Sequence, residues 1–405
     1  MHKSIRSAAT RILPLAALTI ICAISCWAQP TEQILYTFTA GNDGGLPEAG
    51  LILDSKGNLY GTTALGGTSC CGTVFELTPN SNGIWTEQVL YSFTGGAGTG
   101  DGLEPYGGLI FDRTGNLYGT TLGGGSAGGG TVFELSPGLN GVWTEKVLYS
   151  FTGGSNCGAP LFGVILDPVG NLYGTTNSGG TKGFGCAFEL VAGSNGAWSE
   201  KTLYSFTGEN DGGYPYGSLV FDSTGNLYGS AQLGGAHDYG IVFEMSPQLN
   251  GGWREKVIHS FTGGAGGMSP LGTFVFDRAG NLYTDAISAV VELSPSSNGS
   301  WTAKNIHNFV GGSDGATAEA GLIIDKAGNL YGMTYSGGSH RGTVFELTPG
   351  SNGVWTEKML HKFTGSSDGI FPEFANLVVD AQGNVYGTTP TGGAANYGVV
   401  FEVKP

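Results

Sequence analysis

The sequence predicts an all-β fold, namely a seven-bladed β-propeller of four-stranded antiparallel blades. The first observation is the motif Gly-Asn-Leu-Tyr-Gly-Thr-Thr at residues 115–121, which has close copies beginning at Gly57, Gly170, Gly225, Gly280, Gly328 and Gly383. Successive copies lie 48 to 58 residues apart, a period typical of propellers and solenoids. The second observation is that the two ends of residues 29–405 complement each other.

One repeat, residues 108–152, shows how a blade is built. Residues 109–111 form a short apolar run that suits a strand covered on both faces, and residues 112–116 have turn chemistry. Residues 117–121 favour extended structure. A glycine-rich loop leads to a third strand at 131–135, and Asn140-Gly141 marks a tight connection into a long fourth strand at 143–151. We name these four strands a to d, from the axis outwards.

The ends of the chain favour a closed ring over an open stack. Strands a to c occur seven times, but the Asn-Gly-x-Trp pattern before strand d occurs six times, at Trp85, Trp143, Trp198, Trp253, Trp301 and Trp355. Residues 33–39 match a strand d without its hairpin, and residues 399–403 match a strand c without a successor. We predict that strand 33–39 pairs with strand 398–403 and closes residues 29–405 into one domain without open edges. The alternative is an open β-solenoid, but no capping repeat is visible.

Residues 1–28 have the pattern of an export signal. Lys3, Arg6 and Arg11 precede an apolar run at 12–24, and cleavage is expected after Ala28. A lipoprotein, with the lipid on Cys26, is the less favoured alternative because Ala23 suits the recognition pattern poorly. The apolar run is short for a transmembrane helix and no second one follows. We therefore expect an exported protein that is secreted, periplasmic or held at the cell surface.

The charge of the chain limits its partners. Residues 29–405 carry 14 Lys and Arg against 32 Asp and Glu. This acidic balance opposes nucleic acid and anionic membrane surfaces as partners. We expect a monomer without a cofactor.

At this point the repeats resemble a known family. Gly-Asn-Leu-Tyr-Gly-Thr-Thr, Gly-Thr-Val-Phe-Glu-Leu-Thr-Pro, Asn-Gly-x-Trp-Thr-Glu and Leu-Tyr-Ser-Phe-Thr-Gly-Gly look like the GloVer tandem repeat of "choice-of-anchor" bacterial exported proteins. The resemblance covers essentially all of residues 29–405. It implies a secreted repeat protein, often held at the surface, with no established activity to carry over. The chain departs from that pattern in lacking an obvious C-terminal anchor.

Repetition within one chain separates scaffold from candidate function, because a residue needed for chemistry occurs once. An aspartate ends strand a in every repeat and is interpreted as a turn residue that accepts backbone hydrogen bonds: Asp54, Asp112, Asp167, Asp222, Asp277, Asp325 and Asp380. A glutamate recurs in every strand c, where a contact within or between blades is expected. Five loops contain Asp-Gly, at Asp43, Asp101, Asp211, Asp314 and Asp368, interpreted as turn chemistry. No EF-hand-like spacing is present, and we predict no metal site.

The best candidate site lies where the repeats differ. The d–a and b–c loops emerge on one face, which we call the loop face. The position just before strand a should face the mouth of the central channel there, and it holds Glu48, Tyr106, Leu161, Tyr216, Leu271, Glu319 and Phe374. With Glu373 beside Phe374, three glutamates are expected to meet opposite Tyr106 and Tyr216. The ligand-binding candidates are therefore Glu48, Tyr106, Tyr216, Glu319, Glu373 and Phe374. The alternative is an acidic rim that is only solvated.

Four cysteines lie outside the signal. Cys157, in a d–a loop, and Cys186, which opens the following strand c, belong to one face of one blade and are a candidate disulfide. Cys70 and Cys71 are then a strained vicinal pair or two free thiols.

Three functions fit these observations. The first is a non-catalytic propeller that binds a carbohydrate or protein partner through the loop face, since aromatic rings beside carboxylates suit a sugar. The second is a polysaccharide hydrolase or lyase that uses paired carboxylates at the channel mouth. The third is a structural envelope protein. No catalytic residues are assigned.

Overall fold

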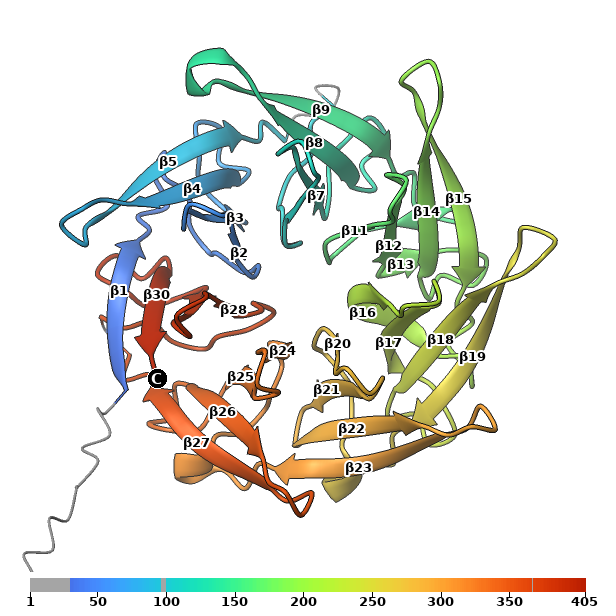
Figure 1. Cartoon of the computed structure of the whole chain (residues 1–405). Helices are drawn as coiled ribbons and strands as arrows, with labels where there is room; N and C mark the ends of the chain where they lie inside the picture. The colour runs from blue at the N-terminus through green and yellow to red at the C-terminus, as the bar shows by residue number, and fades with distance from the viewer. Residues whose placement is uncertain (1–29, 96–99, 366) are drawn as a thin grey trace, which may run out of the picture.

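The computed structural model describes residues 30–95, 100–365 and 367–405. Seven four-stranded antiparallel sheets stand around a central axis like the blades of a propeller (Figure 1). The predicted fold class is therefore confirmed. The predicted signal peptide, residues 1–28, and the alternative lipidation site Cys26 lie outside the described residues. No helix in the described ranges is long and apolar enough to cross a membrane.

The strands of blades 1 to 4 follow one another along the chain. Blade 1 contains β2 (Ile52–Leu53), β3 (Leu59–Thr63), β4 (Thr73–Pro79) and β5 (Trp85–Ser92). Blade 2 contains β6 (Ile110–Phe111), β7 (Leu117–Thr121), β8 (Thr131–Pro137) and β9 (Trp143–Ser150). Blade 3 contains β11 (Ile165–Leu166), β12 (Leu172–Thr176), β14 (Cys186–Ala192) and β15 (Trp198–Ser205). Blade 4 contains β16 (Gly213–Phe221), β17 (Leu227–Leu233), β18 (Ile241–Pro247) and β19 (Trp253–Ser260).

The remaining blades complete the ring. Blade 5 contains β20 (Val275–Phe276), β21 (Leu282–Ala286), β22 (Ala289–Pro295) and β23 (Trp301–Asn308). Blade 6 contains β24 (Ile323–Ile324), β25 (Leu330–Thr334), β26 (Thr343–Pro349) and β27 (Trp355–Lys362). Blade 7 contains β28 (Val378–Val379), β29 (Val385–Thr389), β30 (Val399–Lys404) and β1 (Thr31–Thr37). Short elements in the connections are β10 (Cys157–Gly158), β13 (Ser178–Gly179) and the 3-10 turns η1 (Leu139–Gly141), η2 (Gly264–Gly266) and η3 (Gly312–Asp314).

Blade 7 confirms closure of the ring by the two ends of the chain. β1 pairs antiparallel with β30, with Thr31 opposite Lys404 and Thr37 opposite Val399, so the first and last strands lie side by side (Figure 1). The observed strands begin and end within two residues of the predicted ones. Leu35 and Phe38, at the end of this segment, are buried. The seam of the ring therefore lies inside a blade and is held by a full strand pairing.

The recurring aspartates hold the a–b turns, as their repetition suggests. In blade 1, Asp54 Oδ1 accepts hydrogen bonds from the N–H groups of Lys56 and Asn58, both at 2.8 Å, and its Oδ2 accepts from Asn58 Nδ2 at 3.0 Å. The hydroxyl of Tyr60 lies 3.4 Å from Asp54 Oδ2 and 2.7 Å from Glu76 Oε1, so it links the turn to strand c. Each carboxylate thus satisfies donors that the tight turn would otherwise leave unpaired.

Aromatic rings pack successive blades together around the whole ring. A phenylalanine after strand d meets one in strand c of the next blade at six of the seven interfaces, whereas Val291 takes the strand c position in blade 5; at the seam Phe38 and Phe75 have ring centroids 5.1 Å apart. The strand d tryptophans pack on tyrosines of the preceding blade, as Trp253 does on Tyr173 at 6.1 Å. A buried phenylalanine contributes about 1.5–3 kcal/mol, so these contacts explain the aromatic residues at fixed repeat positions.

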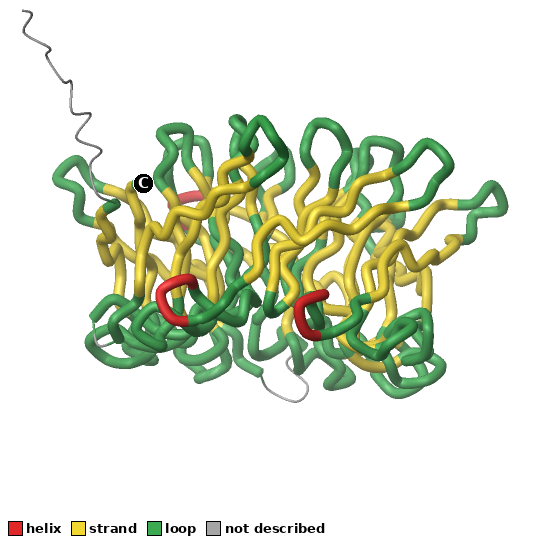
Figure 2. The backbone as a smooth tube through the Cα atoms, turned by 90° about the horizontal axis from the view of Figure 1, so that it is seen from below, coloured by secondary structure: helices red, strands yellow, loops and turns green. Residues whose placement is uncertain are grey.

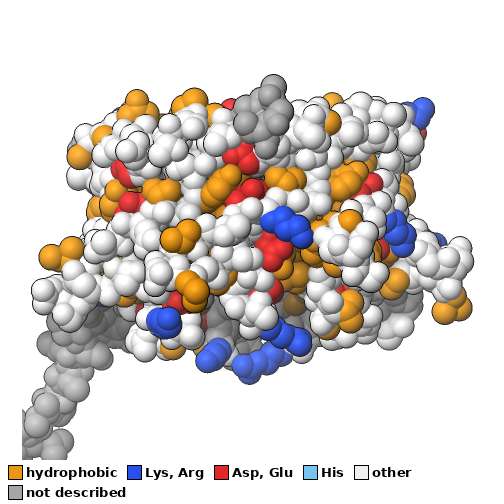
Figure 3. Space-filling model, turned by 90° about the horizontal axis from the view of Figure 1, so that it is seen from above, with side chains coloured by type: hydrophobic (Ala, Val, Ile, Leu, Met, Phe, Trp, Pro, Cys, Tyr) orange, Lys and Arg blue, Asp and Glu red, His pale blue; other side chains and the backbone are white. Residues whose placement is uncertain are grey.

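The two faces of the ring differ in charge. Figure 2 shows the d–a and b–c loops at the lower rim and the a–b and c–d turns at the upper rim, which we call the hairpin face. Among the described residues, the only lysines and arginines in or directly beside the connections of the loop face are Lys182, Arg341 and Lys362. In the side view of Figure 3, most Lys and Arg side chains accordingly gather toward the hairpin face. The loop face is therefore the more acidic one.

Candidate functional site

A repeated kink places one side chain per blade at the channel mouth. The residue two positions before the mouth residue has a positive φ in every blade, for example 55° at Leu46 and 54° at Phe371, and a proline follows it in every blade except blade 6, which has Ala318. The proline that follows lies against a glycine at the start of the preceding strand c, as Pro47 does against Gly398. The chain is thereby turned inward, and the next residue stands at the mouth of the channel.

Blade 7 carries one additional residue at this point, which sequence spacing did not show. Pro372 lies against Gly342 as the other prolines lie against their glycines, so Glu373 is the structural counterpart of Glu48. Phe374 is the inserted residue and has a φ of 56°. The insertion lets blade 7 present both a carboxylate and a ring at the mouth.

The three glutamates come from consecutive blades 6, 7 and 1 and influence one another. All three are half-buried. Burial, with the carboxylate of Glu373, raises the pKa of Glu48 to about 8. Burial, with Glu373 and Asp285, raises the pKa of Glu319 to about 7, and burial also raises the pKa of Glu373. Among the described residues no ion pair involves any of the three, and Glu48 Oε2 is buried without a hydrogen-bond partner.

Aromatic residues occupy the mouth opposite the glutamates. Tyr216 packs against Phe162 with ring centroids 4.6 Å apart and planes tilted by 60°, and it meets Phe374 edge-on at 5.6 Å. Burial and the charges of the three glutamates raise the pKa of Tyr216, so its hydroxyl stays protonated and available as a donor. Burial and nearby carboxylates, Glu48 first among them, also raise the pKa of Tyr106. The structure thus places all six ligand-binding candidates around one mouth, while Leu161 and Leu271 contribute to its apolar side.

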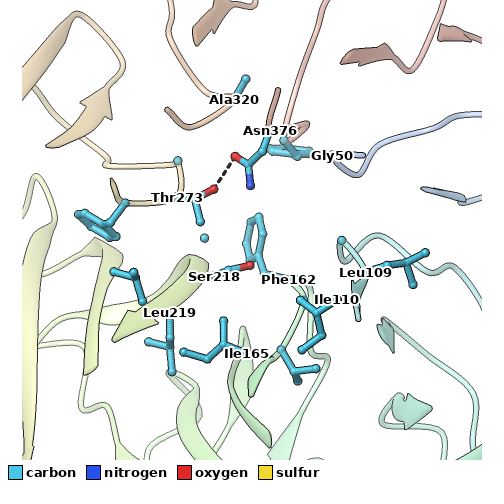
Figure 4. Close-up of a pocket in the computed structure, with 18 of the residues that line it drawn as sticks. Gly50, Leu109, Ile110, Phe162, Ile165, Ser218, Leu219, Thr273, Ala320 and Asn376 are labelled. Carbon is cyan, nitrogen blue, oxygen red and sulfur yellow. Dashed lines mark hydrogen bonds between the residues drawn. The ribbon is translucent and has the colours of Figure 1, made fainter. Parts of the chain in front are cut away.

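The aromatic cluster closes one end of the central channel. Behind it lies a cavity of about 210 Å³, lined by Tyr106, Phe162, Leu271, Phe374 and strand a residues further along the axis. Figure 4 shows Phe162 pointing into the middle of this space, with a hydrogen bond from Thr273 Oγ1 to Asn376 Oδ1 across it. The three glutamates do not line the cavity, so the candidate site is a mouth with an aromatic floor.

Two residues of this region were not predicted from the sequence, although each differs from the residues at the same position of the other repeats. Phe162 stands where the other blades have Ala or Gly, and it fills the axis. Asp285 replaces the Thr or Ser found at that place in most blades and is only 1% exposed. Its Oδ2 accepts a hydrogen bond from Gly321 N–H at 3.0 Å, while Oδ1 has no partner of good geometry. Burial raises the pKa of Asp285 to about 7, against the opposing effect of nearby backbone N–H groups.

The cysteines of blades 1 and 3 are in different states. A disulfide joins Cys157 to Cys186, with Cα atoms 5.7 Å apart, which is the pair that the repeat positions suggested. Cys70 and Cys71 are free thiols whose Sγ atoms lie 3.6 Å apart. Within the described ranges, no group of three or more His, Cys, Asp or Glu side chains is arranged to hold a metal ion.

Comparison with known proteins identifies the repeat. The model of the Gloeobacter/Verrucomicrobia repeat matches residues 25–160, 86–289 and 284–405, which together span the propeller. The chain belongs to the Gloeobacter/Verrucomicrobia repeat family. The resemblance found from the sequence motifs is thereby confirmed. No curated protein sequence matches the chain significantly.

Several solved structures have a fold similar to that of this member of the repeat family. Virginiamycin B lyase from Staphylococcus aureus aligns with a TM-score of 0.56 at 14% identity, covering 93% of this chain and 99% of that one. A streptogramin B lyase aligns with a TM-score of 0.57 at 12% identity, covering 93% and 98%. A protein from Lactobacillus plantarum aligns with a TM-score of 0.55 at 14% identity, covering 86% of this chain and 99% of that one. At these identities the likeness shows the fold alone.

Proposed function

We propose that this Gloeobacter/Verrucomicrobia repeat protein is an exported, non-catalytic, monomeric binding module that takes a carbohydrate or a protein partner at the channel mouth. The observation that supports it most is the convergence of Glu48, Glu319 and Glu373 beside an aromatic cluster, on the face where the repeats differ. The scaffold does not require these residues, since the other blades replace them with Tyr or Leu.

The chemistry of the mouth suits a polyhydroxylated ligand. Carboxylates and the Tyr106 and Tyr216 hydroxyls supply acceptors and donors for hydroxyl groups, and the rings supply faces for C–H stacking. Glu48 has a buried oxygen without a partner, and an unpaired buried oxygen costs free energy that a ligand hydroxyl would recover. A protein loop carrying Ser, Thr or Lys would offer the same groups.

The test replaces Glu48, Glu319 and Glu373 together by glutamine in the exported chain. Wild type and variant are compared on glycan and envelope-protein arrays, and hits are measured by calorimetry. We expect the variant to keep its circular dichroism spectrum and lose at least about tenfold in affinity, since each lost charged hydrogen bond costs about 1.5–3 kcal/mol. Glu209→Gln, on an exposed residue of the same face, is the matched control. Equal binding by the triple variant, or no binding by wild type, contradicts the proposal.

A polysaccharide hydrolase or lyase is the second candidate, and one observation favours it. Glu48 and Glu319 have pKa values raised to about 8 and about 7, and both interact with Glu373. One carboxyl can therefore hold a proton near neutral pH while a neighbour is ionised, as acid–base catalysis requires. Turnover of a polysaccharide, measured by new reducing ends or unsaturated products and abolished by Glu48→Gln with binding retained, would establish the enzyme. A purely structural envelope protein predicts neither binding nor turnover.

A further inference from the structure

Five of the seven blade interfaces contain a pair of acidic side chains, separate from the mouth. In each, the aspartate of a d–a loop faces a glutamate of strand d in the next blade. The pairs are Asp43 with Glu87, Asp101 with Glu145, Asp211 with Glu255, Asp314 with Glu357, and Asp368 with Glu32. Sequence reasoning treated these aspartates as turn residues only, because their partners lie one blade away.

The aspartate of each pair is firmly held as a hydrogen-bond acceptor. Asp211 Oδ2 accepts from Thr207 N–H at 3.0 Å and from the Tyr204 hydroxyl at 2.9 Å, and its Oδ1 accepts from the Thr207 hydroxyl. Asp43 is held in the same way by Thr39 and Tyr36. The oxygens of the aspartate are therefore engaged by donors of its own loop, and none of these donors reaches the neighbouring glutamate.

The glutamate of each pair has a carboxyl oxygen without a hydrogen-bond partner. Its Oε1 is buried without a hydrogen-bond partner in all five cases: Glu32, Glu87, Glu145, Glu255 and Glu357. A buried carboxylate oxygen without a donor, facing another carboxylate, is strongly unfavourable. A proton on the glutamate removes the repulsion and supplies a donor between the two groups.

The two exceptional interfaces support this interpretation because, where the aspartate is absent, the glutamate either has another partner or is absent too. At the interface of blades 2 and 3, Asn156 takes the aspartate's place, and Glu200 Oε1 instead accepts a hydrogen bond from the Thr202 hydroxyl at 2.9 Å. At the interface of blades 4 and 5, Gly266 replaces the aspartate and Ala303 replaces the glutamate. A glutamate with an unpartnered oxygen thus occurs in strand d only where an aspartate faces it.

We propose that the glutamate of each of the five Asp–Glu pairs holds a proton in the folded ring, so that the blade interfaces weaken as the pH rises and these protons pass to solvent. Burial, reinforced by the aspartate charge, raises the pKa of Glu32, Glu87, Glu145 and Glu255 to about 7 and raises that of Glu357. A folded-state pKa raised above the unfolded value gives stability that is complete below about pH 4.5 and is lost as the pH rises through about 7.

The groups around the pairs decide which ones to test. Tyr36, Tyr91 and Tyr204 face the first three pairs and stay protonated, since burial and the nearby carboxylates raise their pKa values. Cys71 also faces Asp101. His307 and His361 face Asp314 and Asp368, and Lys362 acts on Glu357. The pairs Asp43–Glu87 and Asp211–Glu255 are therefore the cleanest, because no histidine, lysine or thiol accompanies them among the described residues.

The experiment measures the melting temperature of the exported chain between pH 5 and pH 8.5. In the variant Glu87→Gln/Glu255→Gln, the fall of melting temperature with pH should become shallower, corresponding to about two protons fewer taken up on folding. Glutamine imitates the protonated acid, so the variant should be the more stable protein at pH 8.5. Glu200→Gln, at the interface that lacks the aspartate, should flatten the slope less than a substitution in a pair, because burial raises the pKa of Glu200 without a facing carboxylate and the Thr202 hydroxyl opposes that rise.

A reciprocal variant installs a sixth pair. Asn156→Asp should steepen the pH dependence, and adding Glu200→Gln to it should abolish this steepening. The infrared band of protonated carboxyl groups at pH 6 should weaken in Glu87→Gln/Glu255→Gln relative to wild type. Unchanged slopes in both Glu87→Gln/Glu255→Gln and Asn156→Asp, or an unchanged infrared band, overturn the proposal. Should the double variant fail to fold, Asp211→Asn serves instead; it alters one pair and leaves the burial of Glu255 in place, so a smaller flattening in the same direction is expected.

Discussion

The carboxyl groups of the blade interfaces and those of the mouth share a physical state but differ in how often they occur. In both regions burial and a neighbouring carboxylate raise the glutamate pKa to about 7 or about 8. The interface pairs recur at five of the seven interfaces, whereas Glu48, Glu319 and Glu373 stand in consecutive blades only. A perturbed pKa alone therefore does not mark a functional site in this ring. Repetition distinguishes the scaffold from the candidate site.

Removing the closing strand should have the largest effect and should act on the scaffold alone. Deletion of residues 29–40 removes β1, Leu35 and Phe38 and opens the seam of blade 7. Each lost buried side chain costs about 2–5 kcal/mol, so we expect the melting temperature to fall by at least about 10 °C. Deletion of residues 29–30 alone is the control. An unchanged melting temperature would rule out closure by β1.

Removing the disulfide tests whether a feature that occurs in one blade contributes to ligand binding or to stability alone. The variant Cys157→Ser/Cys186→Ser should lose about 3 kcal/mol of stability, since the bridge closes a loop of 29 residues. Ligand affinity should stay the same because the bridge lies away from the mouth glutamates. Chemical denaturation and calorimetry measure the two effects, with Cys70→Ser/Cys71→Ser as the control. A loss of binding would place blade 3 within the site.

A repeated turn aspartate should affect stability and nothing else. Asp222→Ala removes the acceptor of hydrogen bonds from Thr224, Asn226 and Tyr228, at an expected cost of about 1–3 kcal/mol. These bonds hold the pKa of Asp222 below its usual range despite partial burial, so this stability is present above about pH 4 and is lost as the pH falls further. Urea titrations at pH 7 and pH 3 should show the difference between wild type and variant shrinking at pH 3.

The smallest stability effect should come from the mouth. Glu48→Gln removes a carboxyl whose folded pKa is raised to about 8. The penalty for ionising it grows as the pH rises from about 4.5 to 8, so the variant should melt about 2–4 °C above wild type at pH 8.5 and at the same temperature at pH 4.5. Scanning calorimetry at both values measures this. A destabilised variant at both would assign Glu48 to the scaffold.

The sequence predicted the architecture because each blade must repeat its turn and core residues to bury its faces. The period, the missing seventh hairpin and the matching ends together predicted closure by β1. The mouth glutamates were found because they interrupt the repeat. Phe162 was missed because its neighbour Leu161 was assigned to the mouth, and the inserted Phe374 concealed that Glu373 is the counterpart of Glu48. Four of the Asp–Glu pairs join residues 43 or 44 positions apart and the fifth, Asp368 with Glu32, joins residues near the two ends of the chain, so only the three-dimensional ring brings them together.

The pairing of Thr31 with Lys404 also fixes how the ring can be presented to its surroundings. Both residues lie at the hairpin face, where the C-terminus is visible in Figure 2, whereas the mouth opens on the opposite face. Anything joined to either end of the propeller, whether an affinity tag, a fused domain or a solid support, is therefore attached behind the mouth. A ring immobilised through either terminus offers its entire loop face to molecules in solution.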